Sequence, residues 1–359
     1  MAIFKSELTA QTAVFFQPNN IPAYQVVRLN IANSVFNRIL VGTVNVKQYF
    51  RPYVGGARSH FDIENLRPGL LGFIGDSIRL VRRSELVFVV GYIPRMMIVA
   101  VLARVMYKNC VIFIDSFESN NKSPKLHKLK RLLLPRVFSG AIVPGLHQNV
   151  FAKSLGFAES KIYRIPFIVD SEHFSRVEGA RREYFLYVGR LSKEKSVELI
   201  IDSYARYKSA GGRRALKICG DGPLKEEIYE KVQRLDLEGV DFQGWVPYDD
   251  LPEIYNGATA LILFSSFEPW GVCVNEAISC GTPLILSDRV GAQECVVEGE
   301  NGFLVEHSNV TALSKKLLSL DDDKLVESFS SASYLISQSF NQEVVASGFS
   351  DIKRDLCEN

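Results

Sequence analysis

The sequence predicts an α/β protein of two Rossmann-like domains that face each other across a cleft. The first observation is length, because 359 residues exceed the size at which a single hydrophobic core stops growing. The second is the recurrence of short apolar runs between helical patterns in both halves. These runs are continuous rather than alternating, which is typical of parallel strands covered by helices on both faces.

Seven apolar runs of strand length mark the expected sheets. They are residues 86–91, 110–115, 140–145, 184–190, 216–222, 260–266 and 282–288. The sequence changes from apolar to polar around residues 166–182, just before a new strand begins. We therefore expect an N-terminal domain over 1–170 and a C-terminal domain over 171–339, with a helix in 340–359 that packs back on the first domain.

Charge is divided unequally along the chain, although the net charge is only +2. Residues 1–174 hold 22 Lys and Arg against 10 Asp and Glu, whereas residues 175–359 hold 20 against 30. A basic half indicates a polyanionic partner surface, either nucleic acid or anionic lipid headgroups.

The stretch 122–136 decides between these two partners. It interleaves six basic residues with five leucines, as in a helix that lies in a bilayer interface. The alternative is a leucine stripe that packs on the core behind a solvated basic face. Together with the basic half, the stretch favours an anionic membrane surface over nucleic acid.

The remaining composition predicts a cytoplasmic protein that is peripheral on the inner face of the cell membrane. The six cysteines form no CxxC pair, and the N-terminal stretch lacks the features of a secretory signal. The most apolar segment is interrupted by Pro94 and Arg95, so no membrane span is expected. The five histidines show no metal-ligand spacing, and we expect neither a metal nor a cofactor.

Chemistry is expected at the turns that follow the strands of the second half, because ligands of open α/β sheets bind there. "VGRLSKEKS" supplies Gly189, Arg190 and Lys195, "CGDGP" supplies Gly220, and "FQGWVP" supplies Val246. Arg190 and Lys195 offer a fork donor and a point charge to one anion, for which a diphosphate is the natural ligand. The alternative is a pair of solvated surface charges.

The stretch "FEPWGVCVNEAISCGTP" places two carboxylates around a helix start. The amides of Trp270, Gly271 and Val272 would open that helix and favour an anion. Glu268 precedes the helix and Glu276 lies inside it, so both can accept hydrogen bonds from sugar hydroxyls. The alternative is that one carboxylate complements the helix dipole and the other is solvated.

Across residues 140–345 these motifs, in this order, resemble retaining glycosyltransferases of the GT-B fold, glycosyltransferase family 4. The resemblance implies that Glu268 contacts the donor sugar and Glu276 the ribose of a nucleotide. It implies that Arg190 and Lys195 neutralise the leaving diphosphate without a metal. The glycine turns and the amides at the helix start would hold the phosphates and sugar, and Val246 would lie near the base.

The first half departs from the family pattern. The loop after its first strand lacks the usual glycine pair, although one occurs at 55–56, and the usual acceptor-side histidine is missing. Asp115 and Glu118 stand near that place and are our acceptor candidates, with Asp115 as a simple turn cap as the alternative. His147, at an expected helix start near the cleft, is a third candidate.

The expected function is the transfer of a sugar from a nucleotide-sugar donor, with retention, to a saccharide or lipid-linked acceptor at the cytoplasmic membrane face. Such a reaction would belong to surface polysaccharide or glycoconjugate assembly. One alternative is a nucleotide-sugar epimerase of the same architecture, which would change the donor without an acceptor. Another is a non-catalytic subunit that binds a nucleotide-sugar, although the retained charges disfavour it.

Overall fold

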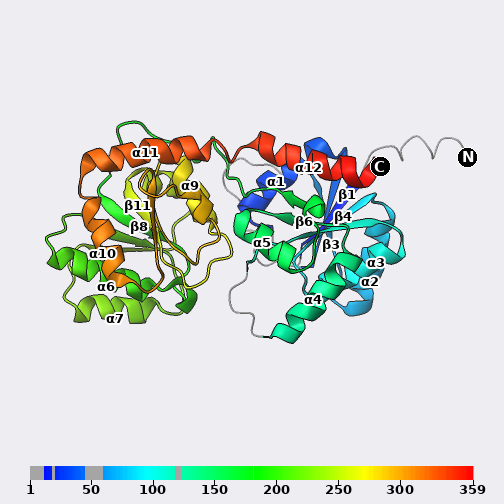
Figure 1. Cartoon of the computed structure of the whole chain (residues 1–359), viewed down its shortest axis with the longest axis horizontal. Helices are drawn as coiled ribbons and strands as arrows, with labels where there is room; N and C mark the ends of the chain where they lie inside the picture. Colours follow the sequence, from blue (N-terminus) through cyan, green and yellow to red (C-terminus); the bar gives the residue numbers. More distant parts are fainter. Residues whose placement is uncertain (1–11, 18–20, 45–59, 118–122, 181, 359) are drawn as a thin grey trace, which may run out of the picture. The chain divides into compact units, whose positions relative to one another are not determined.

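The computed structural model describes residues 12–17, 21–44, 60–117, 123–180 and 182–358. The chain divides into two compact units, Met1–Ile168 with Asn341–Asn359 and Val169–Phe340 (Figure 1). Each unit holds one parallel sheet, of seven described strands in the first and six in the second. The expectation of two Rossmann-like α/β domains is therefore confirmed.

The first unit alternates strands and helices and receives the last helix of the chain. Its elements are β1 (Thr12–Gln17), α1 (Ala23–Val35), β2 (Arg38–Thr43), β3 (Asp62–Asn65), α2 (Leu70–Arg82), β4 (Leu86–Val90), α3 (Pro94–Val105), β5 (Asn109–Phe113), α4 (Pro124–Val137), β6 (Gly140–Val143), α5 (Leu146–Ser154), η1 (Glu159–Lys161), β7 (Ile162–Arg164) and α12 (Gln342–Cys357).

The second unit repeats the alternation. Its elements are β8 (Tyr184–Val188), η2 (Lys193–Lys195), α6 (Val197–Ser209), β9 (Ala215–Cys219), α7 (Lys225–Arg234), β10 (Val240–Gly244), η3 (Tyr248–Asp250), α8 (Leu251–Asn256), β11 (Ala258–Leu263), α9 (Val272–Ser279), β12 (Leu284–Ser287), η4 (Gln293–Cys295), β13 (Gly302–Val305), α10 (Val310–Ser319) and α11 (Asp323–Ser337).

Both sheets have the doubly wound strand order. It runs β3-β2-β1-β4-β5-β6-β7 in the first unit and β10-β9-β8-β11-β12-β13 in the second. The order reverses between β1 and β4 and between β8 and β11, and such a reversal opens a ligand crevice beyond the carboxyl ends of the strands. Helices cover both faces of each sheet (Figure 1). In the second unit, a ligand is therefore expected beyond the carboxyl ends of β8 and β11.

Burial explains which strands the sequence revealed. All seven predicted runs contain a strand, and β11, for example, is buried along its whole length. The edge strands β3 and β10 have no buried residue, so they lack the continuous apolar run that predicts a central strand. These two edge strands were consequently missing from the prediction, which also missed β2 and β13 although both are mostly buried.

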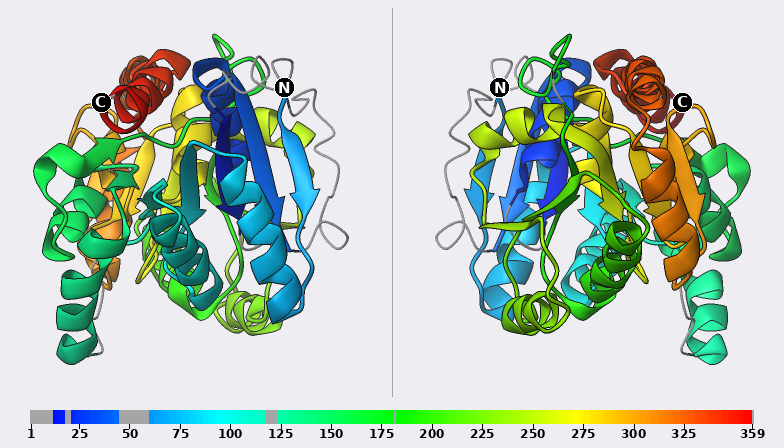
Figure 2. Two further views of the ribbon diagram at one scale, coloured as in Figure 1. Left: turned by 90° about the vertical axis from the view of Figure 1, so that its right-hand side faces the viewer. Right: turned by 90° about the vertical axis from the view of Figure 1, so that its left-hand side faces the viewer.

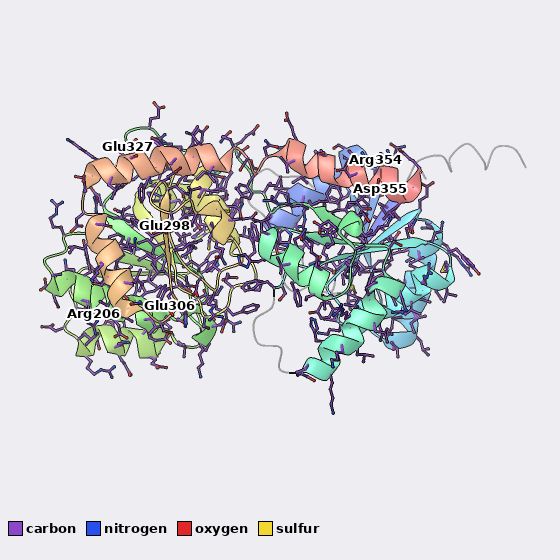
Figure 3. The ribbon with its side chains drawn as sticks, viewed as in Figure 1. Arg206, Glu298, Glu306, Glu327, Arg354 and Asp355 are labelled. Carbon is purple, nitrogen blue, oxygen red and sulfur yellow. The ribbon has the colours of Figure 1, made fainter. Side chains whose placement is uncertain are left out.

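The C-terminal helix packs within the first unit. Phe349 of α12 is fully buried, and its ring lies 6.1 Å from that of Phe15 and 6.0 Å from that of Phe88. A Cβ on Gly348 would lie 2.6 Å from the Ile165 side chain, so a glycine is required for this close approach. Tyr163 donates a hydrogen bond to Asp355, which Figure 3 labels on α12.

Helix α4 confirms the predicted helix but not the alternative in which its leucines face the core. Leu126, Leu129, Leu132 and Leu133 are 43–52% exposed, and Leu134 is the buried residue of the helix. Proline starts the helix and the Ser123 hydroxyl caps it by accepting from the Leu126 amide. The helix lies along the outside of the first unit (Figure 2).

Two sequence expectations concern membranes and cysteines. Within the described ranges, no helix is both long enough and apolar enough to cross a bilayer. All six cysteines are free thiols in the structure.

Candidate active site

The carboxyl edge of the second sheet carries the predicted donor-site residues. Those from the first motif follow β8, Gly220 follows β9, and Val246 follows β10. The two glutamates and the helix-start residues follow β11. The loops after β8 and β11 meet where the strand order reverses, which is the expected place for a ligand in such a sheet.

An ion pair joins these two loops. Nζ of Lys195, at the end of η2, contacts Oε2 of Glu268, which lies beyond β11. Only 18% of the lysine side chain and 11% of the glutamate side chain are exposed, so the pair is screened less than a surface pair. The resemblance implies that Lys195 contacts the diphosphate and Glu268 the sugar. In the structure the two side chains contact each other directly.

The loop after β8 is shaped by local hydrogen bonds. The buried Ser192 hydroxyl donates to the Glu194 carboxylate at 2.5 Å, and this bond lowers the pKa of Glu194. The Lys195 amide donates to the Ser192 carbonyl at 2.9 Å, which closes the η2 turn. Ser196 follows with φ of 50°, a left-handed conformation that starts α6. Lys195 is therefore held on a tight turn.

The loop that carries Glu268 is anchored on both sides. The Glu268 amide donates to the Arg289 carbonyl at 3.1 Å, and its carbonyl accepts from the Gly291 amide at 2.9 Å. The Ser266 amide donates to the Glu194 carbonyl at 2.8 Å, which ties this loop to the loop after β8. Glu268 is 9% exposed, so its carboxylate is fixed by the fold as well as by Lys195.

Helix α9 begins in a geometry that glycine alone permits easily. Gly271 has φ of 97°, and a Cβ there would lie 2.8 Å from the Leu263 side chain. Trp270 is 2% exposed and donates from Nε1 to Oδ1 of Asn275 at 2.7 Å, so its side chain anchors the turn. No side chain caps α9 at Gly271, which leaves its N-terminus suited to an anion.

Glu276 lies within α9 and accepts a hydrogen bond from a side chain of α8. The hydroxyl of Tyr255, a fully buried residue of α8, donates to Oε2 of Glu276 at 2.6 Å. Burial raises the pKa of Glu276 to about 7, and the hydrogen bond from Tyr255 opposes this rise. The carboxyl group is thus poised between its two protonation states near neutral pH.

The charged groups converge around the first turn of α9. Burial raises the pKa of the Cys273 thiol, Glu276 and Glu268 raise it further, and Lys195 opposes them. One thiol therefore lies within electrostatic reach of both carboxylates and the lysine. The structure brings together the two glutamates whose joint action the sequence predicted.

Glycines allow the neighbouring loops to touch. A Cβ on Gly220 would lie 1.8 Å from the Gly189 carbonyl oxygen, and a Cβ on Gly222 would lie 2.3 Å from that of Leu191. The Gly189 amide donates to the Cys219 carbonyl at 3.0 Å. Gly189 and Gly220 were predicted to bind the donor. The close contact between their backbones explains why glycine stands at both positions without any ligand.

Arg190 and Val246 occupy more open positions. Arg190 is exposed and has no carboxylate partner in the part of the chain that the structure describes, in contrast to the paired Lys195. Val246 is half-buried and follows Trp245, which is 58% exposed. A large exposed aromatic beside the expected base position was not singled out from the sequence, although "QGWVP" displays it.

Asp115 of the first unit faces a cation that the sequence analysis missed. Asp115 follows β5, and its Oδ1 is buried without a hydrogen-bond partner among the described residues. Arg28 of α1 is 1% exposed, and its guanidinium carbon lies 4.5 Å from the ring centre of Phe113 and 4.9 Å from that of Phe167. Burial raises the pKa of Asp115 and Arg28 opposes it, so the two side chains sense each other.

Tyr24 completes this group of buried polar residues. Burial, with a contribution from Asp115, raises the pKa of Tyr24 to about 12. Oδ1 of Asp115 accepts no hydrogen bond from a backbone amide of the described residues, so the turn-cap alternative gains no support from that atom. An arginine inside the apolar helix "YQVVRLNIA" was the one sequence signal for this cluster.

The other acceptor candidates have less structural context. Glu118 and the glycine pair at 55–56 lie outside the described residues. His147 is exposed at the second position of α5, and its ring lies 5.8 Å from that of Phe117. Among the described residues, no cluster of three or more His, Cys, Asp or Glu side chains could hold a metal ion.

Comparison with known proteins supports the chemistry that this geometry suggests. Residues 169–336 match the family model described as "Glycosyl transferases group 1". The match covers nearly the whole second unit. The chain is 31% identical over 139 residues to glycogen synthase of Mycobacterium tuberculosis, covering 38% of this chain and 34% of that protein.

A second curated relative is a Campylobacter jejuni enzyme named N-acetylgalactosamine-N,N'-diacetylbacillosaminyl-diphospho-undecaprenol 4-alpha-N-acetylgalactosaminyltransferase. The two are 30% identical over 167 residues, which are 46% of this chain and 44% of the relative. The chain thus spans between a third and a half of the length of these relatives. Both relatives are glycosyltransferases by name.

The fold itself extends over the full chain of a solved structure. Anabaena Alr3699/HepE, crystallised with UDP and glucose, superposes with a TM-score of 0.81 at 19% identity, covering 96% of this chain and 100% of that one. This likeness shows that the two chains share a fold.

Proposed function

We propose that this protein is a retaining glycosyltransferase that takes its sugar from a nucleotide-sugar donor. The observation that carries the proposal is the Lys195–Glu268 pair at the strand-order reversal, beside Glu276 and the N-terminus of α9. A cation, two carboxylates and uncapped helix amides meet there. This set matches a ligand that combines a diphosphate with sugar hydroxyls.

Each group has a distinct role in the proposal. Glu276 accepts hydrogen bonds from the ribose, and Glu268 accepts from the hydroxyls of the transferred sugar. Lys195 moves from Glu268 toward the diphosphate when the donor binds, and the exposed Arg190 joins it there. The amides of Gly271 and Val272 hold the distal phosphate.

The reaction exchanges one bond at the anomeric carbon of the sugar. The bond between that carbon and the diphosphate oxygen breaks, and a bond to the acceptor oxygen forms on the same face. The acceptor hydroxyl loses its proton to the departing diphosphate. Negative charge grows on the diphosphate as the bond breaks, so Lys195 and Arg190 stabilise the transition state more than the bound donor and do so without a metal.

The acceptor is a saccharide or a lipid-linked saccharide at the cytoplasmic face of a membrane. The name of the Campylobacter relative includes a diphospho-undecaprenol, which is a lipid-linked acceptor. The exposed leucines of the basic helix α4 support membrane contact by this chain. Asp115 is our acceptor-side candidate, because it is a polar group beyond the carboxyl end of β5 whose Oδ1 has no hydrogen-bond partner among the described residues.

Sugar transfer from UDP-, GDP- and ADP-sugars to saccharide and lipid-linked acceptors is the direct test. We expect one donor to react, with product of unchanged anomeric configuration by NMR and with activity retained in a chelator. Lys195→Ala and Glu268→Ala should each lower kcat by roughly 10²–10³-fold, as for loss of one preorganised electrostatic contact. Lys193→Ala is the matched control, because Lys193 is an exposed lysine on the same η2 turn.

The outcomes separate the alternatives. Conversion of the donor sugar without any acceptor would indicate an epimerase. Binding of a nucleotide-sugar without turnover of any acceptor would indicate a non-catalytic subunit. Equal losses in the Lys193 and Lys195 variants would contradict the assigned role of Lys195.

A further inference from the structure

A basic hollow lies at the amino-terminal edge of the first sheet, away from the strand ends that carry the acceptor candidates. Its volume is about 500 Å³, and its lining includes Arg104 at the end of α3, Arg136 near the end of α4, and Lys161 just before β7. These three cations come from three different elements. The nucleotide and acceptor chemistry proposed above uses none of them.

The three side chains are exposed and lack carboxylate partners among the described residues. Arg136 donates from Nη1 to the Leu132 carbonyl, which holds its guanidinium against α4. Glu159, two positions before Lys161 in η1, is paired with Lys153. The hollow therefore presents unneutralised positive charge.

The wall of the hollow is closely packed. Gly156 has φ of 91°, and a Cβ there would lie 2.8 Å from the Arg131 carbonyl oxygen of α4. Phe138, which is 4% exposed, closes the floor. The cations thus stand around a fixed concave surface rather than on independent mobile loops.

Apolar side chains are exposed on α4 and at the end of α3, the two helices whose C-terminal residues help to line the hollow. On α4, Leu132 and Leu133 are 52% and 43% exposed. At the end of α3, next to Arg104, Val105 and Tyr107 are 69% and 97% exposed. Exposed apolar groups around a cationic hollow match the chemistry of a lipid, which has apolar chains and a charged headgroup.

We propose that this hollow binds the phosphate headgroup of an anionic membrane lipid while the α4 leucines enter the bilayer interface. Guanidinium groups bind phosphate oxygens bidentately, and Lys161 adds a third positive charge beside the two negative charges of a phosphomonoester. The inference rests on the membrane contact proposed above and assigns it a specific headgroup site. Recognition then involves the phosphate itself and not only the negative charge of the surface.

Vesicle sedimentation tests the proposal with two anionic lipids in phosphatidylcholine at matched surface charge. One set contains phosphatidic acid, which presents a phosphomonoester, and the other contains oleate, which presents a carboxylate. We expect the wild-type protein to bind the phosphatidic acid vesicles roughly tenfold more tightly, which corresponds to ~1.4 kcal/mol. The triple variant Arg104→Gln, Arg136→Gln, Lys161→Gln should bind both sets equally.

Two further variants serve as controls. Arg206→Gln, Lys315→Gln, Lys324→Gln removes the same charge from exposed positions of the second unit, among them Arg206 labelled in Figure 3, and should keep the preference. Leu129→Ser, Leu132→Ser, Leu133→Ser should keep the preference at low salt but lose the binding that survives high salt.

Several results would overturn the inference. If the two charge variants weaken binding equally and both retain the preference for phosphatidic acid, the cations of the hollow contribute to binding only through net charge. If wild-type protein binds both vesicle sets equally, the headgroup site fails while membrane contact stands. If it binds neither set, the membrane contact itself fails. Stabilisation by soluble glycerol 3-phosphate in wild type but not in the hollow variant, without vesicle preference, would assign the site to a soluble phosphate.

Discussion

At Glu276, folding and ligand binding favour different protonation states. Burial raises the pKa of this carboxyl to about 7, so the folded protein holds its proton more firmly than the unfolded chain does. A ribose hydroxyl, in contrast, donates best to the ionised form. The residue that should hold the nucleotide is therefore one that the empty fold tolerates poorly when it is charged.

Glu276→Gln should stabilise the protein at high pH and not at low pH. Below the pKa of the unfolded chain, near 4.5, Glu276 is neutral in both the folded and the unfolded protein. As the pH rises toward 7, the unfolded chain ionises first, and this difference destabilises the wild-type fold. The rise of the pKa from 4.5 to about 7 corresponds to at most about 3 kcal/mol of stability above pH 7. Thermal unfolding at pH 4.5 and pH 8 measures the difference.

The same variant should bind free nucleoside diphosphate more weakly at pH 8, although it is more stable there. The amide still accepts the hydrogen bond from Tyr255, so the local structure is expected to persist. A stability difference that does not change with pH would argue against a raised pKa for Glu276.

Single residues also show where sequence reasoning stopped. The spacing around Glu268 and Glu276 predicts that both carboxylates serve one site, and in the fold both raise the pKa of Cys273. The contact of Lys195 with Glu268 was not predictable, because it joins loops that are 73 positions apart. Arg28 was missed for the same reason, since only the fold places it near Asp115.

At the scale of single elements, amphipathic pattern alone did not fix orientation. Helix α4 has a leucine-rich face that fits either a core or a membrane, and only the exposure of its leucines separates the two. The short edge strands escaped prediction because half-exposed strands lack a continuous apolar run. Most interior strands and α12 were predictable because burial requires an apolar sequence, but β2 was missed although it is buried along most of its length.

Phe349→Ala should destabilise the first unit by about 3–5 kcal/mol, the usual cost of removing a fully buried phenyl ring. Hydrogen exchange measures this unit by unit. Amides of β1 and β4, which carry Phe15 and Phe88, should exchange faster, whereas those of β8 and β11 should not change.

Val344→Ala is the matched control on the same helix, because Val344 is 39% exposed. It should leave exchange in both units nearly unchanged. Equal acceleration in both units after the Phe349 change would mean that the two units unfold together.

For the whole molecule, the α/β class and the two parallel-sheet units were predictable from the sequence, and the edge assigned to the site stays a prediction. A parallel sheet requires continuous apolar strands, and its ligand-binding turns follow the carboxyl ends of those strands. Both features can be recognised as motifs in the sequence. The hollow between α3, α4 and β7 could not be predicted from the sequence, because its three cations are spread over 57 positions and come together only in the fold.

The first unit is discontinuous in the chain, since Asn341–Asn359 completes what Met1–Ile168 begins. On the ribosome, the whole of Val169–Phe340 must be made in between, which takes roughly 10–35 s at ordinary rates of synthesis. Until α12 emerges, Phe15, Phe36 and Phe88 lack the Phe349 ring that packs on them. The second unit can therefore finish folding before the first, and apolar surface of the nascent first unit stays uncovered until α12 is made.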